Sequence, residues 1–262
     1  MTCSICQKEL ATRAGDNNPT YVTCSGCGTV QLVPLPLFES NEAFQGEDVA
    51  RHMAATDRAR GEYLRRRLRL LGTDGRGRRL LDVGCSTGEL MRLAREGGWL
   101  ADGVEMSEEL AGLAREQNPG ARVLTQDILA LAADELPRYD AIVALDVIEH
   151  VVAPRDFVRR LATMLAPGGR LLLQTPNAGS LRARLHAERW NMRLPEYHFH
   201  LFTAAGLRGL LESEGLRVIV STKASGSGTE TGAGKVLALI KEKLLAAAGL
   251  GNALVMVCEK PG

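Results

Sequence analysis

Apolar and polar positions follow a repeating pattern over most of the chain, in which short apolar runs alternate with longer stretches of helical periodicity. Turn-forming residues separate these segments, as at Gly97-Gly98 and Asn118-Pro119-Gly120. Strands that alternate with helices are typical of βαβ units and of a mostly parallel sheet. We therefore expect an α/β fold with a seven-stranded, mostly parallel sheet and helices on both faces. The predicted strands cover residues 79–83, 101–105, 121–125, 139–145, 170–174, 216–221 and 253–258.

The segments outside this pattern differ in character. Residues 33–37 are Val-Pro-Leu-Pro-Leu, which predicts an extended connector. Residues 41–71 predict a helix with leucines on one face and arginines around it, either a solvated surface or a landing site for an anionic substrate or RNA. The Ser-, Gly- and Thr-rich stretch 226–234 predicts a loop before a helix at 235–248. We divide the chain into an N-terminal module, a helical connector and a large domain, at residues 1–36, 37–78 and 79–262.

Four of the six cysteines form two C-x2-C pairs that are separated by 17 residues. This spacing predicts a zinc ribbon, and four thiolates make a closed, structural site rather than a catalytic one. The alternative is a pair of disulfides, which needs an oxidising compartment. Because so short a module buries little apolar surface, we expect the metal to supply its folding energy. The predicted ligands are Cys3, Cys6, Cys24 and Cys27.

The charge balance narrows the range of partners. The chain has 32 Lys and Arg against 31 Asp and Glu, for a net charge of +1. This balance argues against a protein that mainly wraps nucleic acid or coats an anionic membrane. No stretch reaches the roughly 18 apolar residues of a spanning helix, and no apolar secretory segment follows Met1. We therefore expect a cytoplasmic protein without a membrane span.

The first strand of the large domain leads into a glycine-rich turn and a helix, within Leu80-Leu-Asp-Val-Gly-Cys-Ser-Thr-Gly-Glu-Leu. A dinucleotide fingerprint would need glycines where Ser86 and Glu89 stand, so NAD is disfavoured. The turn also matches a G-x-S-x-G nucleophile elbow, but a hydrolase elbow follows several earlier strands of its sheet. The third reading is a site for an adenosyl cofactor without a pyrophosphate.

This third reading coincides with a resemblance to the class I S-adenosylmethionine-dependent methyltransferases over residues 79–262. The turn resembles their L-D-V-G-x-x-x-G element, and Glu105 lies 21 residues past Gly84, where an acidic group accepts from the ribose hydroxyls. Asp146-Val-Ile-Glu-His and Leu165-Ala-Pro-Gly-Gly-Arg complete the family's ordered motifs. The resemblance implies a Rossmann-like methyltransferase sheet and S-adenosylmethionine as cofactor. The cofactor-binding residues that it implies are Asp82, Gly84, Cys85, Gly88, Glu105, Met106, Asp127, Ile128, Leu145 and Val147.

The N-terminal cysteines and residues 195–203 also resemble a subgroup of these enzymes that carries a zinc ribbon and modifies sugars or secondary metabolites. We therefore expect methyl transfer to a small molecule, with oxygen favoured over nitrogen or carbon. The alternative is a zinc-ribbon methyltransferase that modifies ribosomal or other RNA. The neutral net charge and the low aromatic content of 4% argue against nucleic acid. A binding or scaffold protein that only retains the fold is a third class.

A hydroxyl acceptor needs a base, and histidine is the usual base near neutral pH. His150 follows the fourth predicted strand, and His198 and His200 lie between the fifth and sixth. In an extended segment the last two share a face, with His150 approaching from the opposite side. This i, i+2 pair could bind a metal, but no carboxylate pattern near it supports one. Four arginines around Trp190 could bind an anionic group of the substrate, namely Arg182, Arg184, Arg189 and Arg193.

Overall fold

A central seven-stranded sheet organises the computed structural model, which describes residues 1–11, 20–36, 47–72, 74–132, 136–185, 190–224 and 251–262. The strand order is β5-β4-β3-β6-β7-β10-β9, and β10 runs antiparallel to both of its neighbours. The other pairings in this sheet are parallel, as the alternation of strands and helices predicts. The strands are β3 (Arg79–Val83), β4 (Leu100–Glu105), β5 (Val123–Thr125), β6 (Tyr139–Leu145), β7 (Leu165–Pro176), β9 (Arg217–Ala224) and β10 (Ala253–Glu259).

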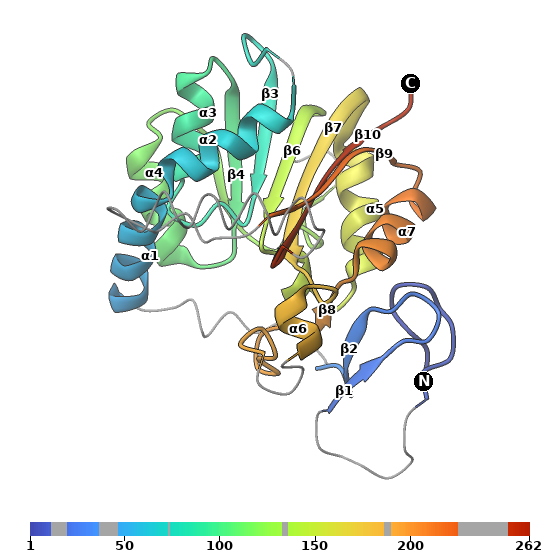
Figure 1. The fold of residues 1–262 in the computed structure, drawn as a ribbon. Helices are drawn as coiled ribbons and strands as arrows, with labels where there is room; N and C mark the ends of the chain where they lie inside the picture. Colours follow the sequence, from blue (N-terminus) through green and yellow to red (C-terminus); the bar gives the residue numbers. More distant parts are fainter. Residues whose placement is uncertain (12–19, 37–46, 73, 133–135, 186–189, 225–250) are drawn as a thin grey trace.

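Helices cover both faces of the sheet, so the fold is the expected Rossmann-like α/β architecture (Figure 1). Alternate strand residues enter different cores: Leu81 packs with the helices of one face and Leu80 with those of the other. One face carries α2 (Gly61–Leu70), α3 (Glu89–Glu96) and α4 (Glu108–Gln117), and the opposite face carries α5 (Pro154–Met164) and α7 (Ala204–Ser213). Both faces are therefore buried, as a parallel sheet requires.

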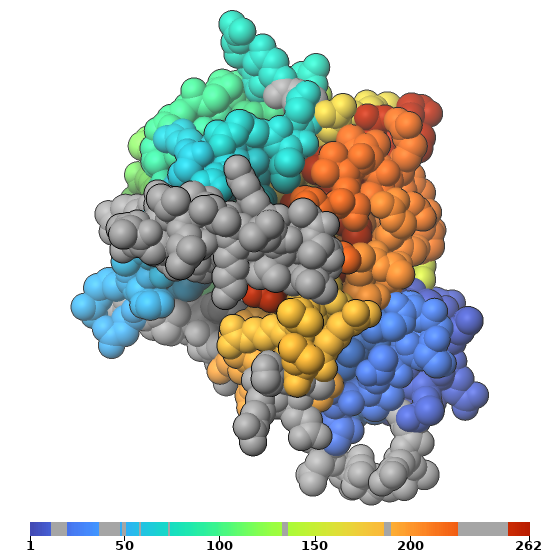
Figure 2. All heavy atoms as spheres, in the orientation of Figure 1, coloured from blue at the N-terminus to red at the C-terminus, as the bar shows by residue number. Residues whose placement is uncertain are grey.

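The N-terminal module joins the large domain through a small second sheet. Its hairpin consists of β1 (Thr20–Thr23) and β2 (Val30–Val33), and β2 pairs antiparallel with β8 (His200–Leu201). A side-chain hydrogen bond also links the module to the large domain: Thr203 Oγ1 donates to the Cys27 carbonyl at 2.8 Å. Figure 2 shows the blue N-terminal residues lying against the gold and orange residues of the large domain. The module therefore supports the segment that leads into β8.

The prediction of one continuous helix at residues 41–71 is wrong. The described part of this range contains two helices, α1 (Glu47–Ala59) and α2, with a break at Arg60. The Arg60 amide is shared between the carbonyls of Thr56 and Asp57, so the regular bonding pattern ends there. The break changes the chain direction and directs α1 toward the glycine-rich turn. The loop and helix expected at 226–248 lie outside the described residues.

The arginine-rich face of α2 is largely paired. Arg65 forms an ion pair with Glu96 at 2.9 Å, and Arg69 pairs with Glu62 at 2.9 Å. These exposed pairs contribute little stability, but they reduce the positive charge available to an anionic partner. A solvated helix face therefore explains them better than an RNA landing site. Across the part of the chain that the structure describes, no helix is both long and apolar enough to cross a membrane.

Candidate functional site

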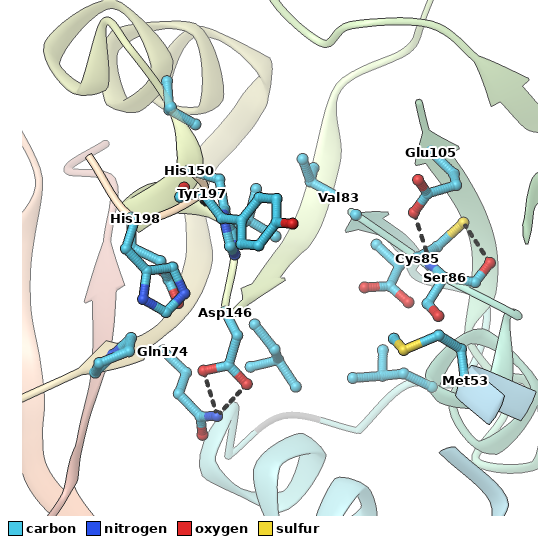
Figure 3. A pocket seen from close by; sticks show the side chains of 18 of the residues that line it. Met53, Val83, Cys85, Ser86, Glu105, Asp146, His150, Gln174, Tyr197 and His198 are labelled. Carbon is cyan, nitrogen blue, oxygen red and sulfur yellow. Dashed lines mark hydrogen bonds between the residues drawn. The ribbon is translucent and has the colours of Figure 1, made fainter. Parts of the chain in front are cut away.

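A cavity of about 870 Å³ opens at the carboxyl ends of the parallel strands. The turns after β3, β4 and β6 line it from the sheet, α1 and α2 line one wall, and residues 190–198 line another. This edge is where open α/β sheets bind ligands. Figure 3 shows two groups of side chains across the cavity, with Glu105, Cys85 and Ser86 at one end and His150, His198 and Asp146 at the other.

The turn after β3 needs glycine at two positions. Gly84 has φ +71°, and a Cβ there would lie 2.6 Å from Val147 Cγ2. Gly88 has φ +82° at the start of α3, and a Cβ there would lie 2.9 Å from the Ala114 Cα. Side chains at either position would collide with well-packed neighbours. Glycine at these positions therefore allows the turn to pack closely against Val147 and Ala114, and Gly84 itself lines the cavity.

Glu105 ends β4 beside this turn and organises the backbone around it. Its Oε2 accepts from the Ser86 amide at 2.9 Å, and its Oε1 accepts from the amides of Met106 and Ser107 at 2.8 and 3.0 Å. The carboxylate lines the cavity, half-buried. Hydroxyl donors of a ligand can therefore reach it without a change of fold.

Asp57 is a site residue that the sequence analysis missed. Its Oδ2 accepts from Ser86 Oγ at 3.0 Å and from Thr87 Oγ1 at 2.8 Å. The carboxylate is buried and lines the cavity from α1. Asp57 lies 29 residues before Ser86 in the sequence, so no local pattern marks it. The hydrolase reading loses support here, because Ser86 donates to a carboxylate and not to a histidine.

Asp82 lies buried at the end of β3, with 4% of its surface exposed. Its pKa is raised to about 8. Burial is the largest cause, and repulsion by the nearby carboxylates of Asp57 and Glu105 adds to it. Acidic groups are therefore concentrated around the turn, and among the described residues Asp57, Asp82 and Glu105 form no ion pair within 4.0 Å. Such an environment favours a positively charged ligand.

The remaining residues of the predicted cofactor set gather at the same end. Asp127 and Ile128 follow β5, and the Leu129 amide donates to Asp127 Oδ1 at 2.9 Å, which holds that carboxylate in place. Gly88 does not line the cavity, because it lies behind the turn at the start of α3. The others do, namely Asp82, Gly84, Cys85, Glu105, Met106, Asp127, Ile128, Leu145 and Val147.

These residues fit S-adenosylmethionine. The cofactor carries a sulfonium, an ammonium and two ribose hydroxyls, and the cavity presents carboxylates to cations and hydroxyl donors. The bare backbone at Gly84 admits a close approach, and Ile128 and Leu145 offer apolar surface for a base. Both the charge and the shape of this end of the cavity are therefore compatible with the cofactor.

A polar network fixes Asp146 on the side of the cavity that carries the imidazoles (Figure 3). The Gln174 Oε1 accepts from Tyr63 Oη at 2.7 Å and from Arg67 Nε at 2.8 Å, and its Nε2 donates to both oxygens of Asp146 at 2.9–3.0 Å. The two donors fix the orientation of the amide, which in turn fixes Asp146. Asp146 has φ +57°, so this network holds a strained, non-glycine backbone in place.

His150 and His198 lie together at the other end, with ring centroids 4.8 Å apart. His150 follows β6 in the short helix η2 (Ile148–His150), and its Nδ1 donates to the Tyr197 carbonyl at 2.9 Å. His198 Nδ1 donates to the Met192 carbonyl at 2.7 Å. Burial lowers the pKa of both imidazoles, that of His150 to about 4, where repulsion by His198 adds to the effect. The expected approach of His150 from the opposite side is therefore wrong.

His200 does not join them. It is fully buried outside the cavity lining, and its Nε2 bonds to Ser4 Oγ of the N-terminal module at 2.7 Å. Burial lowers its pKa to about 4. The pattern of alternate residues fails because the segment turns before β8: the His198 amide donates to the Leu194 carbonyl at 2.7 Å. A shared face for His198 and His200 therefore does not form.

The arginines expected around Trp190 do not form one cluster in the described residues. Arg182 lines the cavity from α6 (Leu181–Leu185), whereas the Arg193 guanidinium lies 5.4 Å from the centre of the Tyr21 ring. Trp190 is buried and lines the cavity. Arg189 lies outside the described residues. Arg182 is thus the member of the set that a substrate in the cavity can reach.

The four N-terminal cysteines converge on one point. Their sulfur atoms lie within 4.8 Å of one another, and Cys3 and Cys24 are buried. None forms a disulfide, although Cys6 Sγ and Cys24 Sγ lie 3.5 Å apart. This arrangement matches a four-thiolate metal site in type and spacing.

Known proteins support the assignment of the large domain. Residues 54–221 match the family described as Methyltransferase domain. A ubiquinone biosynthesis O-methyltransferase from Coxiella burnetii is 34% identical over 106 residues, which are 39% of this chain and 45% of that protein. The chain therefore matches about half the length of this curated relative.

Two solved structures show the same fold. A chain from the complex between the Haloferax volcanii Trm112 methyltransferase activator and a methyltransferase superposes with a TM-score of 0.65 at 16% identity, covering 82% of this chain and 96% of that one. The Haemonchus contortus phosphoethanolamine N-methyltransferase 2, solved with S-adenosyl-L-methionine, gives 0.63 at 18% identity, with 86% and 61% covered. The family match spans more than half of the chain, and the fold agrees with it. The chain therefore belongs to the methyltransferase-domain family, as a class I S-adenosylmethionine-dependent methyltransferase.

Proposed function

We propose that this protein transfers a methyl group from S-adenosylmethionine to a hydroxyl oxygen of a small aromatic molecule. The observation that carries the proposal is that one cavity joins a carboxylate-rich end at the β3 turn to an end with two imidazoles. A cofactor and an acceptor that share one cavity can be aligned for an in-line displacement. The chemistry that the cofactor supplies is an electrophilic methyl group on sulfur.

The chain's own residues divide this work. Glu105 and Asp127 accept hydrogen bonds from the cofactor, and Asp82 lies buried beside the turn, where its raised pKa keeps it largely protonated near pH 7. Gln174 holds Asp146 in place near the imidazoles (Figure 3). These groups are fixed by hydrogen bonds before a ligand arrives, which reduces the ordering cost of binding.

His150 and His198 are the residues that we assign to the acceptor oxygen. Their lowered pKa values keep them neutral near pH 7, so each ring has one nitrogen without a proton. His200 contributes indirectly to the acceptor end, because its hydrogen bond to Ser4 anchors the segment that carries His198. It thus acts as a positioning residue and does not contact the acceptor.

The class of acceptor follows from the lining and from the relatives. Phe157, Trp190 and Tyr197 line the imidazole end, and aromatic side chains pack well on an aromatic acceptor. The relatives named ubiquinone biosynthesis O-methyltransferase support oxygen over nitrogen or carbon. They favour a small aromatic acceptor over the sugar or secondary metabolite expected from the sequence.

We also propose that Cys3, Cys6, Cys24 and Cys27 bind one structural zinc ion. The module that they hold donates from Tyr21 Oη to the His198 carbonyl at 2.7 Å. Zinc therefore supports the imidazole end of the cavity through the ribbon. Metal analysis of the reduced protein is expected to find one zinc per chain, and a folded protein without zinc would contradict this proposal.

Calorimetry and a labelled-methyl assay test the methyl-transfer proposal together. Titration with S-adenosylhomocysteine is expected to show one site per chain, and Glu105→Ala is expected to weaken it. Methyl transfer is then measured on matched phenols, anilines and RNA. Incorporation into the phenols supports the proposal, whereas a preference for the anilines or for RNA would overturn the oxygen or the small-molecule assignment.

A further inference from the structure

A cationic side chain, that of Arg182, lines the cavity from α6. This short helix follows β7 and lies next to β8 (Figure 1). In the order of the sheet, β6 separates β7 from β3, so α6 leaves the sheet on the side away from the cofactor turn. Arg182 therefore belongs to the half of the cavity that carries the imidazoles.

The packing of α6 places Arg182 beside Trp190. Ser180 is buried, and its Oγ accepts from the Ala183 amide at 3.1 Å, which caps the start of the helix. Ala183 is also buried, in one apolar cluster with Trp190 and Leu201 of β8. This cluster fixes the helix against its neighbours, while the Arg182 side chain stays exposed at the cavity. Arg182 and Trp190 thus line the cavity from two segments that pack together.

Both side chains carry donors without a partner. Within the described parts of the chain, neither the Arg182 guanidinium nor the Trp190 indole N–H forms a hydrogen bond or an ion pair. Trp190 is only 4% exposed, and an indole N–H that deeply buried usually has an acceptor. The other arginine that lines the cavity, Arg60, differs, because it pairs with Asp146 at 3.5 Å and stacks on the Tyr63 ring. The donors of Arg182 and Trp190 are therefore available to a ligand that accepts hydrogen bonds.

The carboxyl groups at this end of the cavity oppose an anionic ligand only weakly. The charge of Asp146 is partly offset by Arg60. Burial raises the pKa of Glu149 well above its ordinary value, and the charge of Asp146 adds to this effect, so the neutral form of Glu149 is favoured. Arg182 is thus a positive charge that no carboxylate of the described residues neutralises.

We propose that Arg182 and Trp190 bind a carboxylate group of the methyl acceptor, so that the substrate is a hydroxylated aromatic acid. The proposal deepens the proposed function and rests on it for the acceptor hydroxyl. A carboxylate accepts two parallel hydrogen bonds from a guanidinium, and its remaining lone pairs can accept from an indole N–H. The aromatic ring holds the carboxylate and the hydroxyl at a fixed separation. Binding of the carboxylate at Arg182 therefore determines which hydroxyl of the ring is presented for methyl transfer.

Calorimetry on the full-length protein, saturated with S-adenosylhomocysteine, tests the proposal without any turnover. The probes are para-hydroxyphenylacetate and para-hydroxyphenylacetamide, which share their shape and differ in charge. The wild-type protein is expected to bind the acid about tenfold more tightly than the amide, as one charge-assisted hydrogen bond allows. Arg182→Gln is expected to abolish this preference, and Arg182→Lys to retain part of it, because lysine keeps the charge but not the planar fork.

The same helix offers a matched control. Arg184 is exposed on α6 and does not line the cavity, so Arg184→Gln removes the same charge and is expected to keep the preference for the acid. The preference of the wild-type protein is also expected to shrink as ionic strength rises, because Arg182 is exposed and salt screens its charge. Circular dichroism reports whether each variant is folded.

The outcomes separate this proposal from the proposed function. A wild-type protein that does not bind the acid more tightly than the amide would overturn the carboxylate site, and methyl transfer to neutral phenols would still support the proposed function. A preference that Arg182→Gln leaves unchanged would overturn the site as well. If Arg182→Gln instead weakens S-adenosylhomocysteine binding, Arg182 binds the carboxylate of the cofactor and the proposal is wrong. A preference for the acid that depends on Arg182, without methyl transfer to any phenol, would contradict the proposed function and support the site.

Discussion

The two ends of the cavity are built in different ways. The cofactor end comes mainly from short segments that directly follow β3, β4 and β5, and Asp57 of α1 adds one carboxylate from a distant segment. The acceptor end combines η2 with residues 190–198, and the N-terminal module supports the latter through β8. One end thus depends on local turn geometry, and the other depends on contacts between distant segments.

This difference indicates how the two ends respond to change. A local turn keeps its shape as long as the sheet is folded, because its glycines and backbone bonds lie beside the strands. The acceptor end depends on every segment that meets there, so the loss of a contact in a distant segment can displace its side chains. We therefore expect substitutions to separate cofactor binding from methyl transfer.

The largest expected effect is at the acceptor end. His198→Ala is expected to lower kcat by about a hundredfold or more, because the proposed function assigns this imidazole to the acceptor oxygen. The affinity for S-adenosylhomocysteine is expected to change by less than about twofold, because His198 lies across the cavity from the cofactor end (Figure 3). Steady-state kinetics and calorimetry measure the two quantities. A parallel loss of cofactor affinity would show that the two ends are not separable.

Glu105→Ala is the converse test at the cofactor end. Loss of a ribose contact affects the ground and transition states alike, so KM for the cofactor is expected to rise by about tenfold with a smaller change in kcat. The same steady-state assay measures both constants. A fall in kcat at unchanged KM would place Glu105 away from the ribose.

Asp82→Asn is expected to stabilise the protein while weakening cofactor binding. The pKa of Asp82 is about 8 in the folded chain against an ordinary value of 3.8. Between these values the folded chain holds a proton that the unfolded chain releases, so this group lowers stability as pH rises from about 4 to 8. The variant lacks that penalty, and its Tm is expected to exceed that of the wild type by more at pH 8 than at pH 5. Each kcal/mol gained corresponds to about 2–4 °C.

Scanning calorimetry at both pH values measures this difference. Glu196→Gln is a suitable control, because Glu196 is an exposed carboxylate. A variant that melts below the wild type at pH 8 would contradict the buried, destabilising carboxylate.

The smallest effect is expected for Tyr21→Phe, which removes the bond from the N-terminal module to the His198 carbonyl. One neutral hydrogen bond contributes about 1 kcal/mol. We expect a fall in kcat of a few fold with cofactor affinity unchanged, since the bond supports only the acceptor end. Kinetics at saturating cofactor measure it. An effect on cofactor affinity alone would break the comparison between the two ends.

Local sequence was sufficient for the sheet and for the cofactor turn. The strands at 79–83 and 139–145 agree with the prediction at both ends, because apolar runs and turn residues mark them directly. The prediction of one helix at 41–71 failed because its leucines, Leu64, Leu68 and Leu71, mark only the second part of the range, and shared hydrogen bonds at Arg60 redirect the chain. Asp57 was missed for the same reason, since only that change of direction brings it to the turn.

The histidines show the limit most clearly. The sequence pointed to His198 and His200 as a pair, because they are two residues apart, but the fold places His198 against His150. The sequence by itself determined the α/β alternation, the glycine-rich turn, the acidic strand ends and the four cysteines, all of which depend on spacing along the chain. Only the tertiary structure decided which imidazoles meet, because contacts between distant segments depend on how β8 and η2 pack and not on periodicity.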